Sequence, residues 1–119
     1  MKTNFFKLAK KASLSGEHFQ HRIGAVLIKK NKVVSIGFNR QKTHPKSPSP
    51  FKYLHAEIDC ILGVDSDTLM DSELYVYRQT RNNTLGLSKP CKHCLWMLQL
   101  AGIKKIHHTS EEGYTTYVF

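Results

Sequence analysis

Residues 22–39, RIGAVLIKKNKVVSIGFN, decide the fold. Two runs rich in β-branched residues, Arg22–Lys30 and Lys32–Asn39, flank Asn31, and this arrangement predicts a β-hairpin. The first run is apolar along nearly its whole length, as expected for a strand that is covered on both faces. The hairpin therefore predicts a sheet with helices packed on both of its sides.

Helical patterns lie on both sides of this hairpin in the sequence. Residues 2–15 carry apolar side chains at helical spacing with lysines between them, and a glycine follows as a stop signal. The proline-rich segment 40–54 predicts a loop, and HAEIDCIL at 55–62 predicts a short buried helix. The remaining predicted elements are strand 73–79, helix 91–101, strand 103–109 and strand 114–119.

The order α-β-β-α-β-α-β-β predicts an α/β protein, a three-layer αβα sandwich with a five-stranded mixed sheet. Residues 73–109 read as a strand–helix–strand crossover, so its two strands should be parallel. Only residues 110–113 separate the last two strands, which is too short for a parallel crossover and predicts an antiparallel hairpin. We expect residues 1–119 to form a single domain.

The composition is that of an ordinary globular protein, with 119 residues, 40% hydrophobic and 23% charged, which argues against disorder. No apolar run approaches the roughly 20 residues that a bilayer span needs, so no membrane association is expected. Lysines interrupt the N-terminal segment, unlike a secretory signal. Three cysteines, two of them three residues apart, suit an intracellular metal or redox site better than a disulfide framework, and this predicts a cytoplasmic protein.

The charge is unevenly distributed. The chain carries 18 basic and 9 acidic residues, a net charge of +9. Residues 1–54 hold twelve of the basic residues and one of the acidic ones, a net of +11, whereas residues 55–119 have a net of −2. A positive field of this kind attracts phosphorylated small molecules, nucleic acid or an anionic surface. The alternative is that the charge serves only solubility.

Two short motifs supply metal-ligating side chains: His55-Ala56-Glu57, and Pro90-Cys91-Lys92-His93-Cys94. An imidazole and two thiolates are ligands that zinc prefers, and three protein ligands leave the fourth position open to water, as in catalytic rather than structural sites. Cys91 and Cys94 share one face at the start of a helix, where the positive helix end favours thiolates. Glu57 is free to accept a proton from that water and pass it to a leaving nitrogen.

Two other interpretations of the cysteine pair stay open at this point. A structural zinc knuckle would need a fourth ligand, and His93 between the two cysteines should point away from their shared face. A redox pair would make the nearby His55 and Glu57 a coincidence. Cys60, on an apolar helix face, is expected to be a small core residue.

The H-x-E…P-C-x-x-C pattern is the signature of zinc nucleobase deaminases. Together with the hairpin that ends in GFN, it makes the chain resemble the cytidine deaminase-like superfamily, in particular its cytidine and deoxycytidylate deaminase branch, from Arg22 to about His108. The resemblance implies one catalytic Zn²⁺ per chain held by His55, Cys91 and Cys94, with Glu57 as the proton shuttle. It also implies that Asn39 holds the sugar hydroxyls and that the Ala56 amide contacts the base.

The loop before the first motif carries positive charges that could meet a substrate phosphate or a polynucleotide backbone. It connects the predicted sugar-binding residue to the predicted metal ligand, so it must pass near the mouth of the site. The alternative is a solvated loop without a binding role. The candidate contacts are Arg40, Lys42, Lys46 and Lys52.

Three functions compete. The first is a hydrolase of class EC 3.5.4 that deaminates a free cytosine nucleoside or nucleotide, with dCMP or deoxycytidine expected, to the uracil form and ammonia. The second is a deaminase of tRNA or single-stranded nucleic acid, favoured by the basic N-terminal half. The third is a zinc-binding module without catalysis, against which the intact Glu57 argues. The residues alone do not choose between a cytosine and an adenine base.

The predicted terminal hairpin bears on this choice and on assembly. In the superfamily that the chain resembles, small cytidine deaminases have such a hairpin, whereas tRNA adenosine and large deoxycytidylate deaminases tend to place a helix between these strands. The hairpin thus favours a free nucleoside or nucleotide. It also leaves the helix over 91–101 less covered, so we expect a homo-oligomer that uses Trp96, Met97 and Leu100.

Overall fold

The computed structural model describes residues 3–16, 22–40, 55–79, 90–110 and 113–119. Its sheet has five strands in the order β2-β1-β3-β4-β5, and the pair β3–β4 is parallel whereas the other pairs are antiparallel. The predicted mixed sheet and the terminal antiparallel hairpin are confirmed. The strands are β1 (Arg22–Lys29), β2 (Lys32–Phe38), β3 (Glu73–Gln79), β4 (Lys105–Ser110) and β5 (Gly113–Val118).

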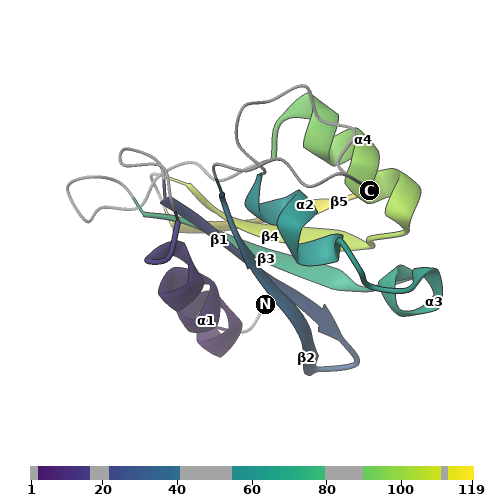
Figure 1. Cartoon of the computed structure of the whole chain (residues 1–119), viewed down its shortest axis with the longest axis horizontal. Coiled ribbons are helices and arrows are strands. Elements are labelled where there is room, and N and C mark those ends of the chain that lie inside the picture. The colour runs from purple at the N-terminus through teal and green to yellow at the C-terminus, as the bar shows by residue number, and fades with distance from the viewer. Residues whose placement is uncertain (1–2, 17–21, 41–54, 80–89, 111–112) are drawn as a thin grey trace.

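Helices cover both faces of this sheet, which confirms the three-layer arrangement (Figure 1). On one face, Phe6 and Ala9 of the first helix pack against Val26 and Tyr75 of the sheet. On the other face, a larger core joins the three further helices to the alternate residues of the same strands. The helices are α1 (Thr3–Ser13), α2 (Ala56–Ile61), α3 (Ser66–Leu69) and α4 (Lys92–Ala101).

The hairpin that organises the sheet closes through a two-residue turn. Lys30 and Asn31 both have positive φ, 51° and 64°, the combination found in type I′ turns, whose twist matches that of the flanking strands. The strand before this turn, β1, is buried from Gly24 to Ile28, as the apolar run predicts. This interior strand pairs with β2 on one side and β3 on the other.

Several predicted boundaries need correction. Residues 64–72, whose acidic and turn-forming side chains predict a turn, contain α3. Asp65 caps this helix by accepting hydrogen bonds from the Thr68 amide and hydroxyl. A single helical turn is too short to show a hydrophobic period. The strand expected over 103–109 runs over Lys105–Ser110, because the Ile103 amide still bonds the helix carbonyl of Leu98. The last strand is Gly113–Val118 rather than 114–119.

None of the described helices is long and apolar enough to cross a membrane.

Candidate metal centre

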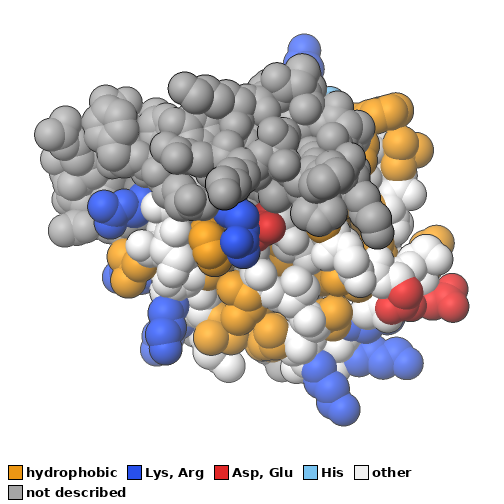
Figure 2. All heavy atoms as spheres, in the orientation of Figure 1, with side chains coloured by type: hydrophobic (Ala, Val, Ile, Leu, Met, Phe, Trp, Pro, Cys, Tyr) orange, Lys and Arg blue, Asp and Glu red, His pale blue; other side chains and the backbone are white. Residues whose placement is uncertain are grey.

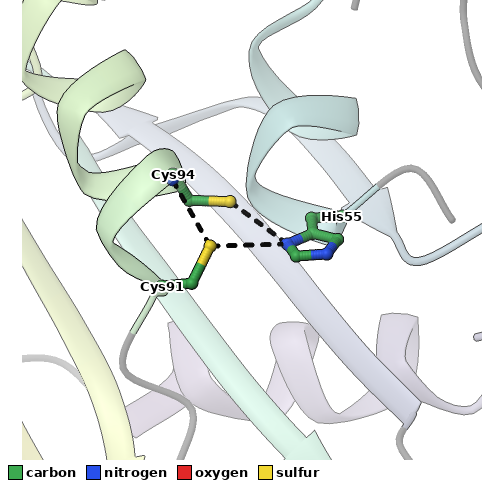
Figure 3. Close-up of side chains that lie close together, drawn as sticks. All are labelled: His55, Cys91 and Cys94. Atoms are coloured by element: carbon green, nitrogen blue, oxygen red, sulfur yellow. Dashed lines mark hydrogen bonds between the residues drawn. The ribbon is translucent and has the colours of Figure 1, made fainter. Parts of the chain in front are cut away.

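Two helix starts bring the three predicted metal ligands together. His55 is the N-cap of α2, and Cys91 is the N-cap of α4, where its Sγ accepts a hydrogen bond from the Cys94 amide at 3.5 Å. The helix α4 therefore begins at Lys92, one residue later than predicted. The three side chains point toward one another from the starts of the two helices (Figure 3). Cys91 is exposed, Cys94 is buried and His55 is half-buried, so the group lies at the surface with one closed side.

The geometry of this group fits a zinc ion. His55 Nδ1 lies 3.2 Å from Cys94 Sγ and 3.9 Å from Cys91 Sγ, and the three ligand atoms lie within 4.8 Å of one another. With Zn–S near 2.3 Å and Zn–N near 2.0–2.1 Å, ligands around a tetrahedral ion sit roughly 3.4–3.8 Å apart. Among the described residues this is the one such group of three or more, and His93 is not part of it.

Burial sets the ionisation of the ligands. It is the main reason that the pKa of Cys94 lies well above its ordinary value, and the negative charges of Glu57 and Cys91 raise it further. Burial likewise lowers the pKa of His55, with a smaller contribution from the charge of His93. At Cys94, burial and the neighbouring negative charges therefore oppose the thiolate that the positive helix end is predicted to favour. A divalent cation at this point reverses the balance, because it binds the thiolate and the neutral imidazole.

Glu57 lies beside the ligands in the first turn of α2 and is only 4% exposed. Burial raises the pKa of Glu57 to about 7, although hydrogen bonds with its own backbone amide and with Cys94 oppose the shift. A carboxyl group with a pKa near neutrality can both accept and return a proton during one reaction cycle. This is the behaviour that the sequence pattern predicts for the proton shuttle.

The two residues expected to contact substrate lie at the same end of the molecule. Ala56 is the first residue of α2, where backbone N–H groups have no partner within the helix. Asn39 directly follows β2, is 6% exposed, and is fixed to β1 by two hydrogen bonds. Its backbone amide donates to the Ile23 carbonyl at 3.2 Å, and its side-chain Oδ1 accepts from the Ile23 backbone amide at 3.1 Å.

A close approach of strand and helix brings Asn39 toward the ligands. A side-chain carbon added at Gly37 would lie 2.6 Å from the Cys60 amide nitrogen and 2.7 Å from the Ala56 carbonyl oxygen. Only glycine fits there, because both of these atoms belong to the backbone of α2 and cannot move aside. The end of β2 is thereby seated directly on the helix that begins at His55.

Of the four predicted phosphate or polyanion contacts, the structure describes only Arg40. Its Nε lies 3.1 Å from Asp59 Oδ1, and its guanidinium carbon lies 4.2 Å from the centre of the Phe38 ring. The Arg40 charge is therefore engaged by the protein. Lys42, Lys46 and Lys52 lie outside the described residues. Sequence reasoning missed Asp59, although it stands two positions after Glu57.

Cys60 is a fully buried core residue, as expected. Its Sγ contacts the Ser35 carbonyl oxygen at 3.5 Å and the Ala25 carbonyl oxygen at 3.7 Å. Burial raises the pKa of Cys60 to about 12, so it stays a thiol at neutral pH and takes no part in the metal group.

Comparison with known proteins agrees with this site. Residues 1–110 match the family described as "Cytidine and deoxycytidylate deaminase zinc-binding region". The chain is 28% identical over 116 residues to a probable deoxycytidylate deaminase of Caenorhabditis elegans, a match that covers 87% of this chain and 54% of that protein. The chain thus spans about half the length of this curated relative.

Two solved structures share the fold. The dCMP deaminase of cyanophage S-TIM5 is 24% identical with a TM-score of 0.68, over 91% of this chain and 84% of that one. The cytidine deaminase of Mycobacterium leprae is 18% identical with a TM-score of 0.61, over 96% and 91% of the two chains. The family match extends through both ligand motifs, whose side chains converge on a zinc-like geometry. The chain belongs to the family of the cytidine and deoxycytidylate deaminase zinc-binding region, and His55, Cys91 and Cys94 form a possible site for its zinc.

Proposed function

We propose that this chain is a zinc-dependent hydrolytic deaminase of class EC 3.5.4, which converts a cytosine nucleotide or nucleoside to its uracil form and ammonia. The observation that carries the proposal is the buried carboxyl group of Glu57 beside the three converging ligands His55, Cys91 and Cys94. A structural zinc site would need a fourth protein ligand and has no use for a buried carboxyl group next to it.

In this proposal each residue has one task. His55, Cys91 and Cys94 hold one zinc ion, which supplies Lewis-acid activation of the attacking water. Glu57 accepts one proton from that water and delivers it to the ring nitrogen, and then takes the remaining proton of the added hydroxyl and delivers it to the departing amine. One water is consumed and one ammonia is released for each base.

The substrate contacts come from the ends of two elements. The Ala56 amide, in the first turn of α2, where N–H groups lack partners within the helix, donates to the base. Asn39 holds the sugar hydroxyls from its fixed place beside β1, where two hydrogen bonds to Ile23 set its orientation.

We expect dCMP or its nucleoside, deoxycytidine, as the substrate. The antiparallel β4–β5 pair supports a free nucleoside or nucleotide, and the curated relative with 28% identity is named for deoxycytidylate. Lys42, Lys46 and Lys52 remain the predicted contacts for its phosphate. A deaminase of tRNA or single-stranded nucleic acid is the second candidate, because residues 1–54 carry a net charge of +11.

Assembly and location are part of the same proposal. Trp96 and Leu100 of α4 are 57% and 67% exposed, and hydrophobic side chains gather at the surface over α4 (Figure 2), which supports a homo-oligomer. Met97, the third residue predicted for this surface, is partly buried and packs against the core. The described cysteines are all free thiols, which supports a reducing compartment such as the cytoplasm. The sheet draws strands from Arg22 to Val118, in keeping with one domain over residues 1–119.

A screen for ammonia release tests the proposed activity. Zinc-loaded protein is incubated with cytidine, deoxycytidine, CMP, dCMP, adenosine, tRNA and single-stranded DNA. We expect the highest kcat/KM with dCMP or deoxycytidine. Activity confined to the polynucleotides would replace the first candidate with the second, and zinc-loaded protein without activity on any of them would contradict both.

A variant of the basic loop tests whether its lysines bind the substrate phosphate. Neutralising Lys42, Lys46 and Lys52 together should raise KM for dCMP more than for deoxycytidine. Equal effects on the two substrates would remove the phosphate role of this loop.

For the assembly, replacing Trp96 and Leu100 with lysine should give a smaller species in light scattering, whereas a wild-type monomer would contradict the oligomer.

A further inference from the structure

Asp59 contacts both chain neighbours of Asn39. Its Oδ2 accepts a hydrogen bond from the Phe38 amide at 3.1 Å, and its Oδ1 lies 3.1 Å from Arg40 Nε. One carboxylate thus holds the backbone just before Asn39 and the side chain just after it. Asn39 itself is tied to Ile23 by two further hydrogen bonds, so the residue is held from both sides.

The position of Asp59 on α2 links this contact to the helix that carries Glu57. Asp59 stands two residues after Glu57 on the same six-residue helix, which His55 caps. Because Gly37 lets the backbones of β2 and α2 meet, the contact closes a short, stiff connection between the strand end and the helix. Any movement at Asp59 would change the distance between the proposed sugar-binding residue and the proposed proton shuttle.

Arg40 completes the arrangement through two contacts within the protein. Its guanidinium contacts the Asp59 carboxylate and lies over the face of the Phe38 ring, at 4.2 Å from the ring centre. The Asp59 side chain is only 13% exposed, so removal of Arg40 would leave a mostly buried carboxylate without this cation. A phosphate that recruited Arg40 would have to break this pair.

We infer that Asp59 and Arg40 form a positioning brace, which holds Asn39 at a fixed distance from Glu57, and that Arg40 does not bind substrate phosphate. The inference rests on the proposed function for the roles of Asn39 and Glu57. Neither Asp59 nor Arg40 touches the reacting atoms, so the brace should act on substrate binding more than on the chemical step.

Kinetics with a nucleotide and its nucleoside test the brace. Asp59→Ala should raise KM about tenfold for both dCMP and deoxycytidine while kcat changes less than about threefold, because both contacts are lost and Glu57 is untouched. Arg40→Ala should raise both KM values by about threefold, since the Phe38 hydrogen bond remains. Adding Arg40→Ala to Asp59→Ala should have little further effect, because the two residues act as one unit. Lys32→Ala, at the far end of β2, is the charge-matched control and should behave as wild type.

Three results would overturn the inference. A rise in KM confined to dCMP in Arg40→Ala would make Arg40 a phosphate ligand. Full additivity of the two substitutions would show that the residues act separately. Unchanged KM values in both single variants would show that the contact positions nothing. Asp59→Asn, which keeps one acceptor oxygen and the side-chain shape, serves if Asp59→Ala does not fold, and its KM should lie between those of wild type and the predicted Asp59→Ala.

Amide hydrogen exchange gives a readout that does not depend on activity. The Phe38 amide should exchange at least about tenfold faster in Asp59→Ala than in wild type or in Lys32→Ala, because its acceptor is gone. If zinc-loaded wild type deaminates neither substrate, the proposed function fails and exchange alone decides the brace. Faster exchange confined to residues near Phe38 then supports it, and unchanged exchange overturns it.

Discussion

Two clusters built around a histidine can be compared in the described part of the chain, and they differ in whether their side chains converge as metal ligands would. The first is the metal group at the starts of α2 and α4. The second joins three strands: His107 Nε2 lies 2.8 Å from Glu73 Oε1, and His107 Nδ1 lies 2.8 Å from Thr116 Oγ1. It lies on the α1 face of the sheet, where the His107 ring packs on Tyr75 with ring centres 4.4 Å apart.

The two clusters differ in what their polar atoms contact: in one they bond to each other, and in the other their lone pairs converge on one point. In the second cluster Glu73 can only accept, so His107 Nε2 donates to it, and Nδ1 accepts from the Thr116 hydroxyl. Each atom thereby has a short partner within the protein. In the metal group a nitrogen and two sulfurs, all lone-pair donors to a cation, surround one point at zinc-like spacing. A histidine near a carboxylate therefore indicates a functional site only when its lone pairs converge on a point that the protein leaves to a ligand.

The largest predicted effect separates the clusters by metal content. Cys94→Ala should reduce bound zinc from one ion per chain to near zero and abolish deamination, because two protein ligands hold zinc poorly. His107→Gln should keep both the zinc and the activity. Elemental analysis and ammonia release measure the two outcomes. Zinc retained in Cys94→Ala would contradict the assignment of Cys94 as a zinc ligand.

A smaller effect concerns stability at neutral pH. His107→Gln should lower the free energy of unfolding by about 1–3 kcal/mol, because the buried imidazole joins Glu73 and Thr116 across three strands. Urea unfolding of wild type and variant measures the difference. Thr116→Val removes only one of the two hydrogen bonds and should cost less, so a larger loss in this variant would contradict the assignment.

The smallest effect is a dependence of that difference on pH. Burial lowers the pKa of His107 in spite of Glu73, so the folded protein holds the ring neutral at pH 7 and the contact is a hydrogen bond rather than an ion pair. As pH falls below about 6.5, the unfolded chain takes up the proton first and the stability contributed by His107 declines. The gap in unfolding free energy between wild type and His107→Gln should therefore shrink from pH 7.5 to pH 5.5. A gap that widens would show that the folded state binds the proton more tightly.

Glu73 extends the same trend to lower pH. Burial alone would raise its pKa, but the hydrogen bond and charge of His107, with Lys104 and Lys105, lower it overall. Its contribution to stability is therefore present above its ordinary pKa and lost as pH falls below it. Glu73→Gln should remove this acidic part of the pH dependence.

The sequence predicts most of the fold because its signals are local. Strand Glu73–Gln79 has the predicted bounds, and the short connection before Gly113 correctly predicts the antiparallel pairing of β4 and β5. The ligand motifs are equally readable, since His55, Cys91 and Cys94 each stand at the start of a helix. What these features share is that neighbouring residues determine them.

The features that sequence reasoning missed depend on contacts between distant elements. Asp59 gains its role only because Gly37 lets β2 rest on α2, and no local pattern reveals which strand a helix will touch. The bonds of His107 to Glu73 and Thr116 arise in the same way, from the order of β3, β4 and β5 in the sheet. Arg40, expected to face a phosphate, pairs with Asp59 for the same reason.

The most direct test of the account compares wild type with Glu57→Gln on dCMP, both proteins carrying the same measured zinc. The substitution preserves shape but removes the proton acceptor beside the ligands, so ammonia release should fall by roughly 10²–10⁴-fold at unchanged zinc content. Equal rates of dCMP deamination in the two zinc-loaded proteins would contradict the central claim that Glu57 is the proton shuttle of a deaminase.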